Sequence, residues 1–137
     1  MMRLVPVDVV GLAPMSPIIT DDEAAASFRA AVRLFSRWGL TDEQAAILLD
    51  MGLRSYRRWK TEGPGRMGRD GKARLSNLMG IHKGLRLIFG ESPRVYEWIK
   101  APNAVFGGAS ALDVMLQGEL TDLIRVRRYL DAERGGW

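Results

Sequence analysis

Two short stretches of the chain carry the same helix-start signal, and this signal restricts what the chain can fold into. Thr20-Asp-Asp-Glu23 and Thr41-Asp-Glu-Gln44 each place a threonine three residues before a glutamate or glutamine. In such a capping box, the two side chains satisfy backbone N–H groups that a helix leaves unpaired at its start. Acidic residues in the first turn also complement the helix dipole. The chain is therefore expected to start two helices in close succession.

The helical spacing of apolar residues continues along almost the whole chain. The first helix has an apolar face made of Phe28, Ala31, Val32, Phe35 and Trp38. Further helices are expected over about 72–89, from Pro93 at the first helical position through Trp98, from Ser110 to Gln117, and from about Glu119 to Glu133. Strand-like alternation is limited to Leu4–Val10. The pattern predicts an all-α fold.

Composition agrees with a small helical protein that needs no covalent or metal support. The chain has 137 residues, of which 47% are apolar, so it can bury a core as one domain or as two small lobes sharing a core. It contains no cysteine, which excludes thiolate metal sites, thiol nucleophiles and disulfides and suits a cytoplasmic location. No stretch is long and apolar enough for a membrane-spanning helix.

The first 19 residues are apolar but do not have the pattern of a signal peptide. Pro6, Asp8, Pro14 and Pro17 interrupt every apolar run before it reaches the length of a signal-peptide core. We expect residues 1–19 to form an extended arm, and a disordered tail is the alternative.

Positive charge is concentrated in one segment of the chain. Residues 53–75 hold 8 basic and 2 acidic side chains, whereas residues 1–52 hold 4 and 7 and residues 76–137 hold 8 and 7. A local basic patch of this kind indicates an anionic partner such as nucleic acid. The alternative is a solvated basic surface. Arg66, Arg69, Lys72 and Arg74 extend the patch beyond residue 60.

Residues 41–60 have the features of a helix–turn–helix, in which the second helix enters the major groove of DNA. Ala46 provides the small residue that such a motif needs inside its first helix, and Tyr56 and Trp59 can form the inner face of its second helix. The turn position that favours glycine is occupied by Asp50, which tolerates the left-handed conformation better than most residues. We assign residues 20–75 to this part, with an unrelated helical pair as the alternative. The expected DNA-binding residues are Arg54, Ser55, Arg57, Arg58 and Lys60.

The sequence offers little for catalysis, a metal or a cofactor. Gly63–Gly68 reads G-x-G-x-x-G, but a dinucleotide site needs a preceding strand, and a helix precedes it here. His82 is the single histidine and lies on an apolar helix face, as expected for a packed boundary residue. Gly80 and Gly84, one turn apart on that helix, indicate close approach of a neighbouring helix or a local bend. We predict a protein that is not an enzyme and needs neither metal nor cofactor.

The last third of the chain has a signature of its own. It consists of Trp98, Pro102-Asn103, Phe106-Gly107-Gly108, Ser110–Met115, Gly118 and a final helix with Leu130. In the order and spacing of these parts, residues 94–134 resemble the antitoxin family variously called Xre, MbcA or ParS, and residues 40–60 look like the helix–turn–helix of that family. Two positions depart from the family pattern: Ala111 stands where a proline is usual, and Asp50 replaces the turn glycine.

The resemblance implies a type II antitoxin paired with a RES-domain toxin that consumes NAD or transfers its ADP-ribose. In that family the C-terminal module, here residues 76–137, binds the toxin and obstructs its active-site cleft. The helix–turn–helix part serves dimerisation and repression of the shared operon, so operator DNA and a second copy of the chain are further expected partners. The expected toxin-binding residues are Asn103, Phe106, Gly107, Gly108, Leu112, Met115, Arg127, Arg134, Gly135, Gly136 and Trp137.

Within that set, Arg134 to Trp137 suggest how inhibition works. Two glycines follow the last helix and precede an aromatic residue, which could stack where a ring of NAD would bind. An inert, frayed segment is the alternative. For the whole chain, the competing interpretations are a stand-alone helix–turn–helix regulator whose C-terminal bundle only dimerises and, from another class, a nucleic-acid-modifying enzyme.

Overall fold

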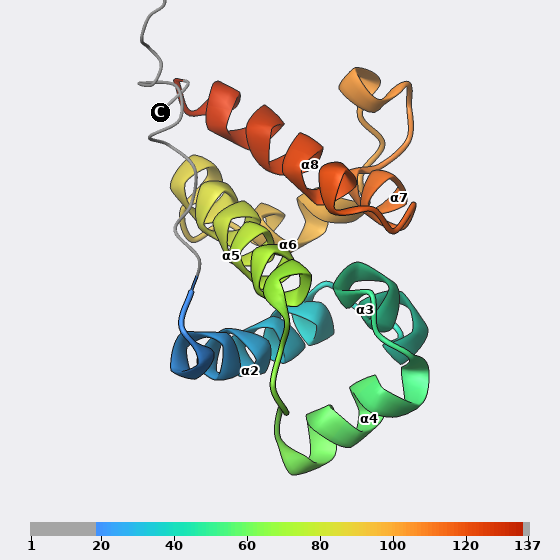
Figure 1. Cartoon of the computed structure of the whole chain (residues 1–137). Helices are drawn as coiled ribbons and strands as arrows, with labels where there is room; N and C mark the ends of the chain where they lie inside the picture. Colours follow the sequence, from blue (N-terminus) through green and yellow to red (C-terminus); the bar gives the residue numbers. More distant parts are fainter. Residues whose placement is uncertain (1–18, 136–137) are drawn as a thin grey trace, which may run out of the picture.

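A computed structural model describes residues 19–135 of the chain, and these residues form an assembly of helices (Figure 1). The extended arm and the strand-like run expected near the N-terminus lie outside the described residues, apart from Ile19. The described part contains no β-strand, which confirms the predicted all-α fold. Its α-helices are α2 (Asp21–Arg37), α3 (Asp42–Leu49), α4 (Leu53–Glu62), α5 (Arg69–Phe89), α6 (Arg94–Glu97), α7 (Ala111–Met115) and α8 (Leu120–Glu133). Two 3₁₀ turns, η1 (Trp98–Lys100) and η2 (Ala104–Phe106), lie between α6 and α7.

Both predicted capping boxes are present and start the helices expected of them. At α2, the Glu23 N–H donates to Thr20 Oγ1 at 3.1 Å, and the Thr20 N–H donates to Glu23 Oε1 at 2.7 Å. Thr41 and Gln44 form the same pair of bonds at α3. Ser110 caps α7 with Asp113 as its partner. These starts are local, because each needs only four consecutive residues.

Helix α5 is the central element of the fold. It packs against α2 and α3 on the N-terminal side and against α6 and α8 on the C-terminal side (Figure 1). Leu75, Leu78, Ile81 and Leu85 form its fully buried face. The boundary expected between residues 75 and 76 lies inside α5, so the two parts of the chain share this helix.

The structure corrects two expected helix starts, and it ends α6 at Glu97 and α7 at Met115, each before the end expected from the sequence. Helix α5 starts at Arg69 rather than near residue 72, so Gly71 lies inside its first turn. Asp70 in that turn complements the helix dipole and accepts a hydrogen bond from Arg74 one turn later. Pro93 was expected at the first helical position but is the residue preceding α6. Ser92 Oγ accepts from the Arg94 N–H at 3.2 Å, which sets the start of α6 one residue later.

Gly80 and Gly84 form the contact surface of α5 with α8. A side-chain carbon at Gly80 would overlap the guanidinium of Arg127, and one at Gly84 would lie 3.4 Å from the Cβ of Leu130. Of the two expectations for these glycines, close approach of a neighbouring helix is therefore confirmed. His82, on the same helix, is half-buried and stacks on the ring of Tyr96 at 5.9 Å, as predicted for a boundary residue. Burial lowers the pKa of His82.

Arg74 is a buried cation that joins distant segments. Its side chain is 5% exposed. Its guanidinium donates to Asp70 Oδ2 at 2.7 Å, to the Leu48 carbonyl at 3.2 Å and to the Gly118 carbonyl at 2.9 Å. The expectation that Arg74 extends the exposed basic patch was wrong, because the end of α3 and the turn before α8 enclose this side chain.

Replacing Arg74 with methionine keeps an unbranched side chain but removes the donor to two backbone carbonyls. We expect the free energy of unfolding to fall by about 3 kcal/mol, because buried acceptors lose their charged partner. Urea unfolding followed by circular dichroism measures this change. Arg69→Met, on the exposed surface of the same helix, is the matched control and should change stability by less than about 0.5 kcal/mol. Equal stabilities of the two variants would contradict the assigned role.

Candidate functional site

The connection between α3 and α4 has the geometry of a tight helix–turn–helix turn. Asp50 adopts the left-handed conformation with φ 52° and ψ 48°, and it is the sole non-glycine residue with positive φ in the described part of the chain. Backbone N–H groups of Asp50 and Met51 donate to Ile47 and Ala46 and close the end of α3. Asp50 thus takes the conformation predicted for the position where glycine is usual.

Two aromatic residues fix α4 against the rest of the fold. Tyr56 is buried, and its ring centroid lies 6.0 Å from that of Phe28. Trp59 is partly buried and meets Phe28 edge to face at 5.6 Å. Burial raises the pKa of Tyr56 to about 12. Both rings therefore hold the helix in place, as predicted, and the basic side chains between them face outward.

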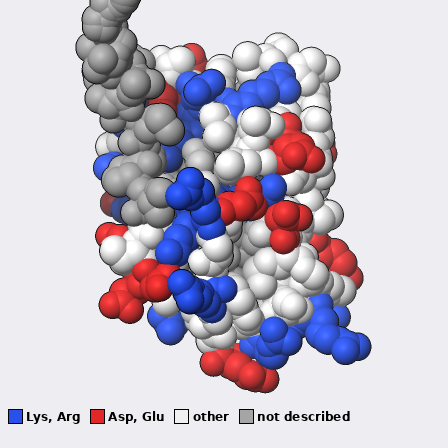
Figure 2. Space-filling view, viewed as in Figure 1, with Lys and Arg blue, Asp and Glu red and all other residues white. Residues whose placement is uncertain are grey.

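The five predicted DNA-binding residues lie together on α4, but they are not equally available. Figure 2 shows Lys and Arg side chains along the lower edge of the molecule, where Figure 1 places α4. Arg57 Nε lies 3.1 Å from Asp42 Oδ2, and Lys60 Nζ lies 2.9 Å from Asp42 Oδ1. These hydrogen bonds hold the pKa of the Asp42 carboxyl below its usual value. The first turn of α3 therefore partly neutralises two of the four cations.

The remaining predicted residues of α4 lack such partners. Arg54 and Arg58 are exposed and form no ion pair within residues 19–135, and Ser55 is half-buried beside them. Beyond α4, Arg66 and Arg69 are exposed, whereas Lys72 pairs with Asp21 at 2.7 Å. This pairing lowers the pKa of Asp21. With Arg74 buried and Lys72 paired, the free basic surface is smaller than the sequence indicates.

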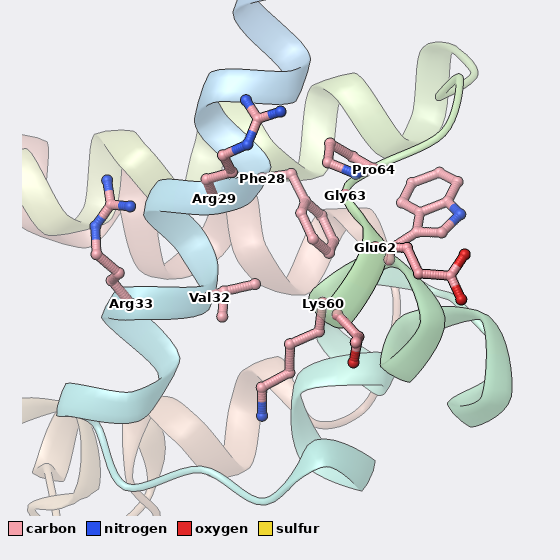
Figure 3. A pocket seen from close by; sticks show the side chains of 10 residues that line it. Phe28, Arg29, Val32, Arg33, Lys60, Glu62, Gly63 and Pro64 are labelled. Carbon is pink, nitrogen blue, oxygen red and sulfur yellow. The ribbon is translucent and has the colours of Figure 1, made fainter.

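A groove of about 420 Å³ lies beside α4 (Figure 3). Its lining residues come from α2, from the end of α4 and from the turn that follows α4: Phe28, Arg29, Val32, Arg33, Trp59, Lys60, Thr61, Glu62, Gly63 and Pro64. Arg29 and Arg33 were not among the predicted site residues. The sequence does show that Arg29 and Arg33 lie four residues apart on the polar side of the first helix. Residues 1–52 are acidic overall, however, and the net count therefore gave no sign of a local pair of cations.

On the C-terminal side, residues 102–110 form a closed turn. Asn103 Oδ1 accepts from the Val105 N–H at 3.0 Å, and the Asn103 N–H donates to the Ala109 carbonyl at 3.0 Å. Pro102 and Ser110 pair across the base of the turn. Gly107 and Gly108 have φ values of 70° and 91°, which favour glycine. The predicted residues Asn103, Phe106, Gly107 and Gly108 are therefore brought together in one ordered turn.

Aromatic contacts attach this turn to α8. Phe106 is buried and meets Tyr129 edge to face at 5.6 Å, and Tyr129 in turn stacks on Trp98 at 6.1 Å. The guanidinium of Arg125 lies 5.3 Å from the centre of the Phe106 ring. Val105 at the tip of the turn is 49% exposed. Sequence reasoning did not select Val105 or Tyr129, because their positions on this surface depend on contacts across the chain.

The structure does not bring all predicted toxin-binding residues to that turn. Leu112 and Met115 are buried in the core through α7. Arg127 is half-buried against α5 and donates to the Ser76 carbonyl at 3.4 Å. Arg134 pairs with Asp131 at 2.9 Å near the end of α8, and Gly135 follows it with φ 106°. Gly136 and Trp137 lie outside the described residues.

No group of three or more histidine, cysteine or carboxylate side chains within residues 19–135 could hold a metal ion. No helix in that range has the length and apolar character needed to cross a membrane.

Two family models match successive parts of the chain, and the matched ranges meet within α5. A family model described as the antitoxin Xre-like helix-turn-helix domain matches residues 17–80, which contain α2, α3 and α4. A model described as the antitoxin Xre/MbcA/ParS C-terminal toxin-binding domain matches residues 84–136. Uncharacterized protein y4oB of Sinorhizobium fredii is 43% identical over 122 residues, which cover 88% of this chain and 94% of that protein. With a helix–turn–helix and a toxin-binding part both matched in order, the chain belongs to the Xre/MbcA/ParS family of antitoxins.

Proposed function

We propose that the protein neutralises a RES-domain toxin that consumes NAD or transfers ADP-ribose, by obstructing the active site of that toxin. The match of residues 84–136 to a toxin-binding domain carries this proposal. The ordered turn at 102–110 supports it, because a surface that is already rigid loses little conformational entropy on binding. The antitoxin acts in the cytoplasm, by binding rather than by catalysis.

We assign the two functions to the parts of the chain at the two ends of α5. Residues 76–137 hold the toxin, and residues 20–75 bind operator DNA through α4 and repress the shared operon. The repressing species is a homodimer within a toxin–antitoxin hetero-oligomer, since a helix–turn–helix dimer reads two half-sites. The exposed Arg54 and Arg58 support the DNA contact. The same two residues favour the second candidate, a stand-alone regulator whose C-terminal part only dimerises.

Within the toxin-binding part, the segment from Arg134 to Trp137 enters the toxin's cleft. The ion pair between Arg134 and Asp131 fixes the start of this segment against α8. From that anchor, the glycines that follow allow Trp137 to stack in place of a ring of NAD.

Co-expression with a RES-domain toxin tests the function. We expect growth to be restored and the two proteins to purify as one complex, because the C-terminal part occupies the toxin. The Arg54→Ala/Arg58→Ala variant is the matched control and should rescue growth equally, since both residues lie on α4. Absence of both rescue and complex would leave the stand-alone regulator as the better explanation.

Deletion of residues 134–137 tests the role of the C-terminal segment. We expect toxin affinity to fall by about tenfold or more, because an aromatic anchor of an interface contributes about 1.4 kcal/mol or more. Titration calorimetry with the full-length and shortened proteins measures this change. Arg134→Ala alone separates loss of the ion pair to Asp131 from loss of Trp137. Unchanged affinity of the shortened protein would refute the insertion of this segment.

Removal of the unpaired cations of α4 tests the DNA contact. We expect Arg54→Ala/Arg58→Ala to weaken binding to the gene's own promoter by about tenfold or more, because side chains that reach DNA contribute about 1–3 kcal/mol each. Asp42→Asn should instead strengthen binding, because it removes the negative charge that pairs with Arg57 and Lys60 on this side of the molecule. Fluorescence anisotropy with labelled promoter DNA at fixed salt measures both. A result of no change in either variant would exclude α4 as the DNA-reading helix.

A further inference from the structure

The groove between α2 and the end of α4 is a second basic surface, separate from the outward face of α4. Arg29 and Arg33 lie one helical turn apart on α2, so their side chains emerge on the same side of that helix. Both are exposed, and neither forms an ion pair within the described residues. Two arginines held on one rigid helix without acidic partners form a surface that suits an anion.

The opposite wall of the groove continues this surface to α4. Figure 3 shows Phe28 and Val32 of α2 projecting toward α4, while the ends of Arg29 and Arg33 extend outward from α2 at the rim, and Lys60 and Glu62 lie on α4. Gly63 and Pro64 close one end of the groove, in the turn that leaves α4. The rim thus carries three cations, Arg29, Arg33 and Lys60, and one carboxylate, Glu62. Of the three cations, Lys60 is already paired with Asp42.

The floor of the groove holds its two walls at a fixed separation. Phe28 lies on the floor and contacts both Tyr56 and Trp59 of α4. Because these rings interlock α2 with α4, any partner that α4 positions is also positioned relative to Arg29 and Arg33. A long anion that lies against α4 would therefore contact Arg29 and Arg33 of α2 at a fixed distance from the cations of α4.

We propose that this groove is a docking surface for the sugar–phosphate backbone of operator DNA, with Arg29 and Arg33 as its phosphate ligands. The inference rests on the proposed DNA binding by α4. In this arrangement α4 reads base edges, and the two arginines of α2 hold the flanking phosphates and set the register of the protein on the duplex. Glu62 on the same rim opposes the phosphates by charge repulsion.

Charge complementarity favours DNA as the occupant. The phosphate backbone is a continuous row of negative charges, and the unpaired cations of α2 lie beside the helix whose Arg54 and Arg58 are also exposed and unpaired. Phosphate contacts of this kind carry no sequence information, so Arg29 and Arg33 contribute equally to promoter DNA and to unrelated DNA.

The salt dependence of DNA binding by Arg29→Gln/Arg33→Gln tests the proposal. The slope of log K against log salt concentration should become shallower by about 0.9 for each lost phosphate contact, or about 1.8 for the pair. Affinity for promoter DNA and for a scrambled duplex should fall by the same factor. Lys83→Gln/Arg86→Gln removes the same charge from exposed positions on α5 and is the matched control, with an unchanged slope. Glu62→Gln should strengthen binding to both duplexes, a gain that a folding defect cannot produce.

The outcomes separate this inference from the proposed function. An unchanged slope for Arg29→Gln/Arg33→Gln, with binding still lost in Arg54→Ala/Arg58→Ala, would overturn the groove as a backbone contact and leave DNA reading by α4 intact. Weaker toxin binding by Arg29→Gln/Arg33→Gln without any effect on DNA would assign the groove to the toxin and overturn the inference as well. A wild-type protein without salt-sensitive DNA binding would overturn both the inference and the repressor function.

Discussion

The guanidinium of Arg74 holds the end of α3 and the turn before α8 against the same helix, and the arrangement of the two halves depends on this contact. Its partners, the carbonyls of Leu48 and Gly118, are 26 and 44 residues away in the chain. A buried cation has few favourable positions, because its charge must be satisfied where water cannot reach it. The helix–turn–helix part and the C-terminal part are therefore fixed relative to each other through α5.

The parts of this fold that could be predicted from sequence are those with local causes. The capping boxes at Thr20 and Thr41 need only four residues each, and the aromatic face of α4 needs only helical spacing. The parts that could not be predicted depend on contacts between remote residues. Nothing near Lys72 indicates its pairing with Asp21, and nothing near Arg57 indicates Asp42. Counting charge along the chain therefore located the basic region but misjudged which cations remain free.

The two interfaces differ in how their geometry is maintained. The proposed DNA surface on α4 is electrostatic, and Asp42 of α3 already pairs with Arg57 and Lys60, so phosphates would have to compete with this carboxylate. The turn at 102–110, which we propose contacts the toxin, is instead held by hydrogen bonds of Asn103 and by the aromatic contacts of Phe106, Tyr129 and Trp98. Salt is accordingly expected to affect the first surface far more than the second.

Helix α5 has a further consequence for an assembly on DNA, because it runs unbroken from the helix–turn–helix part to the toxin-binding part. A helix of this length spans about 30 Å and acts as a stiff spacer, since each residue adds a fixed rise. Two antitoxin copies on neighbouring half-sites would therefore carry their toxins at a separation set by the DNA. The spacing of the operator half-sites would then determine whether the two bound toxins contact each other. The promoter DNA would in this way set the arrangement of the toxin–antitoxin complex.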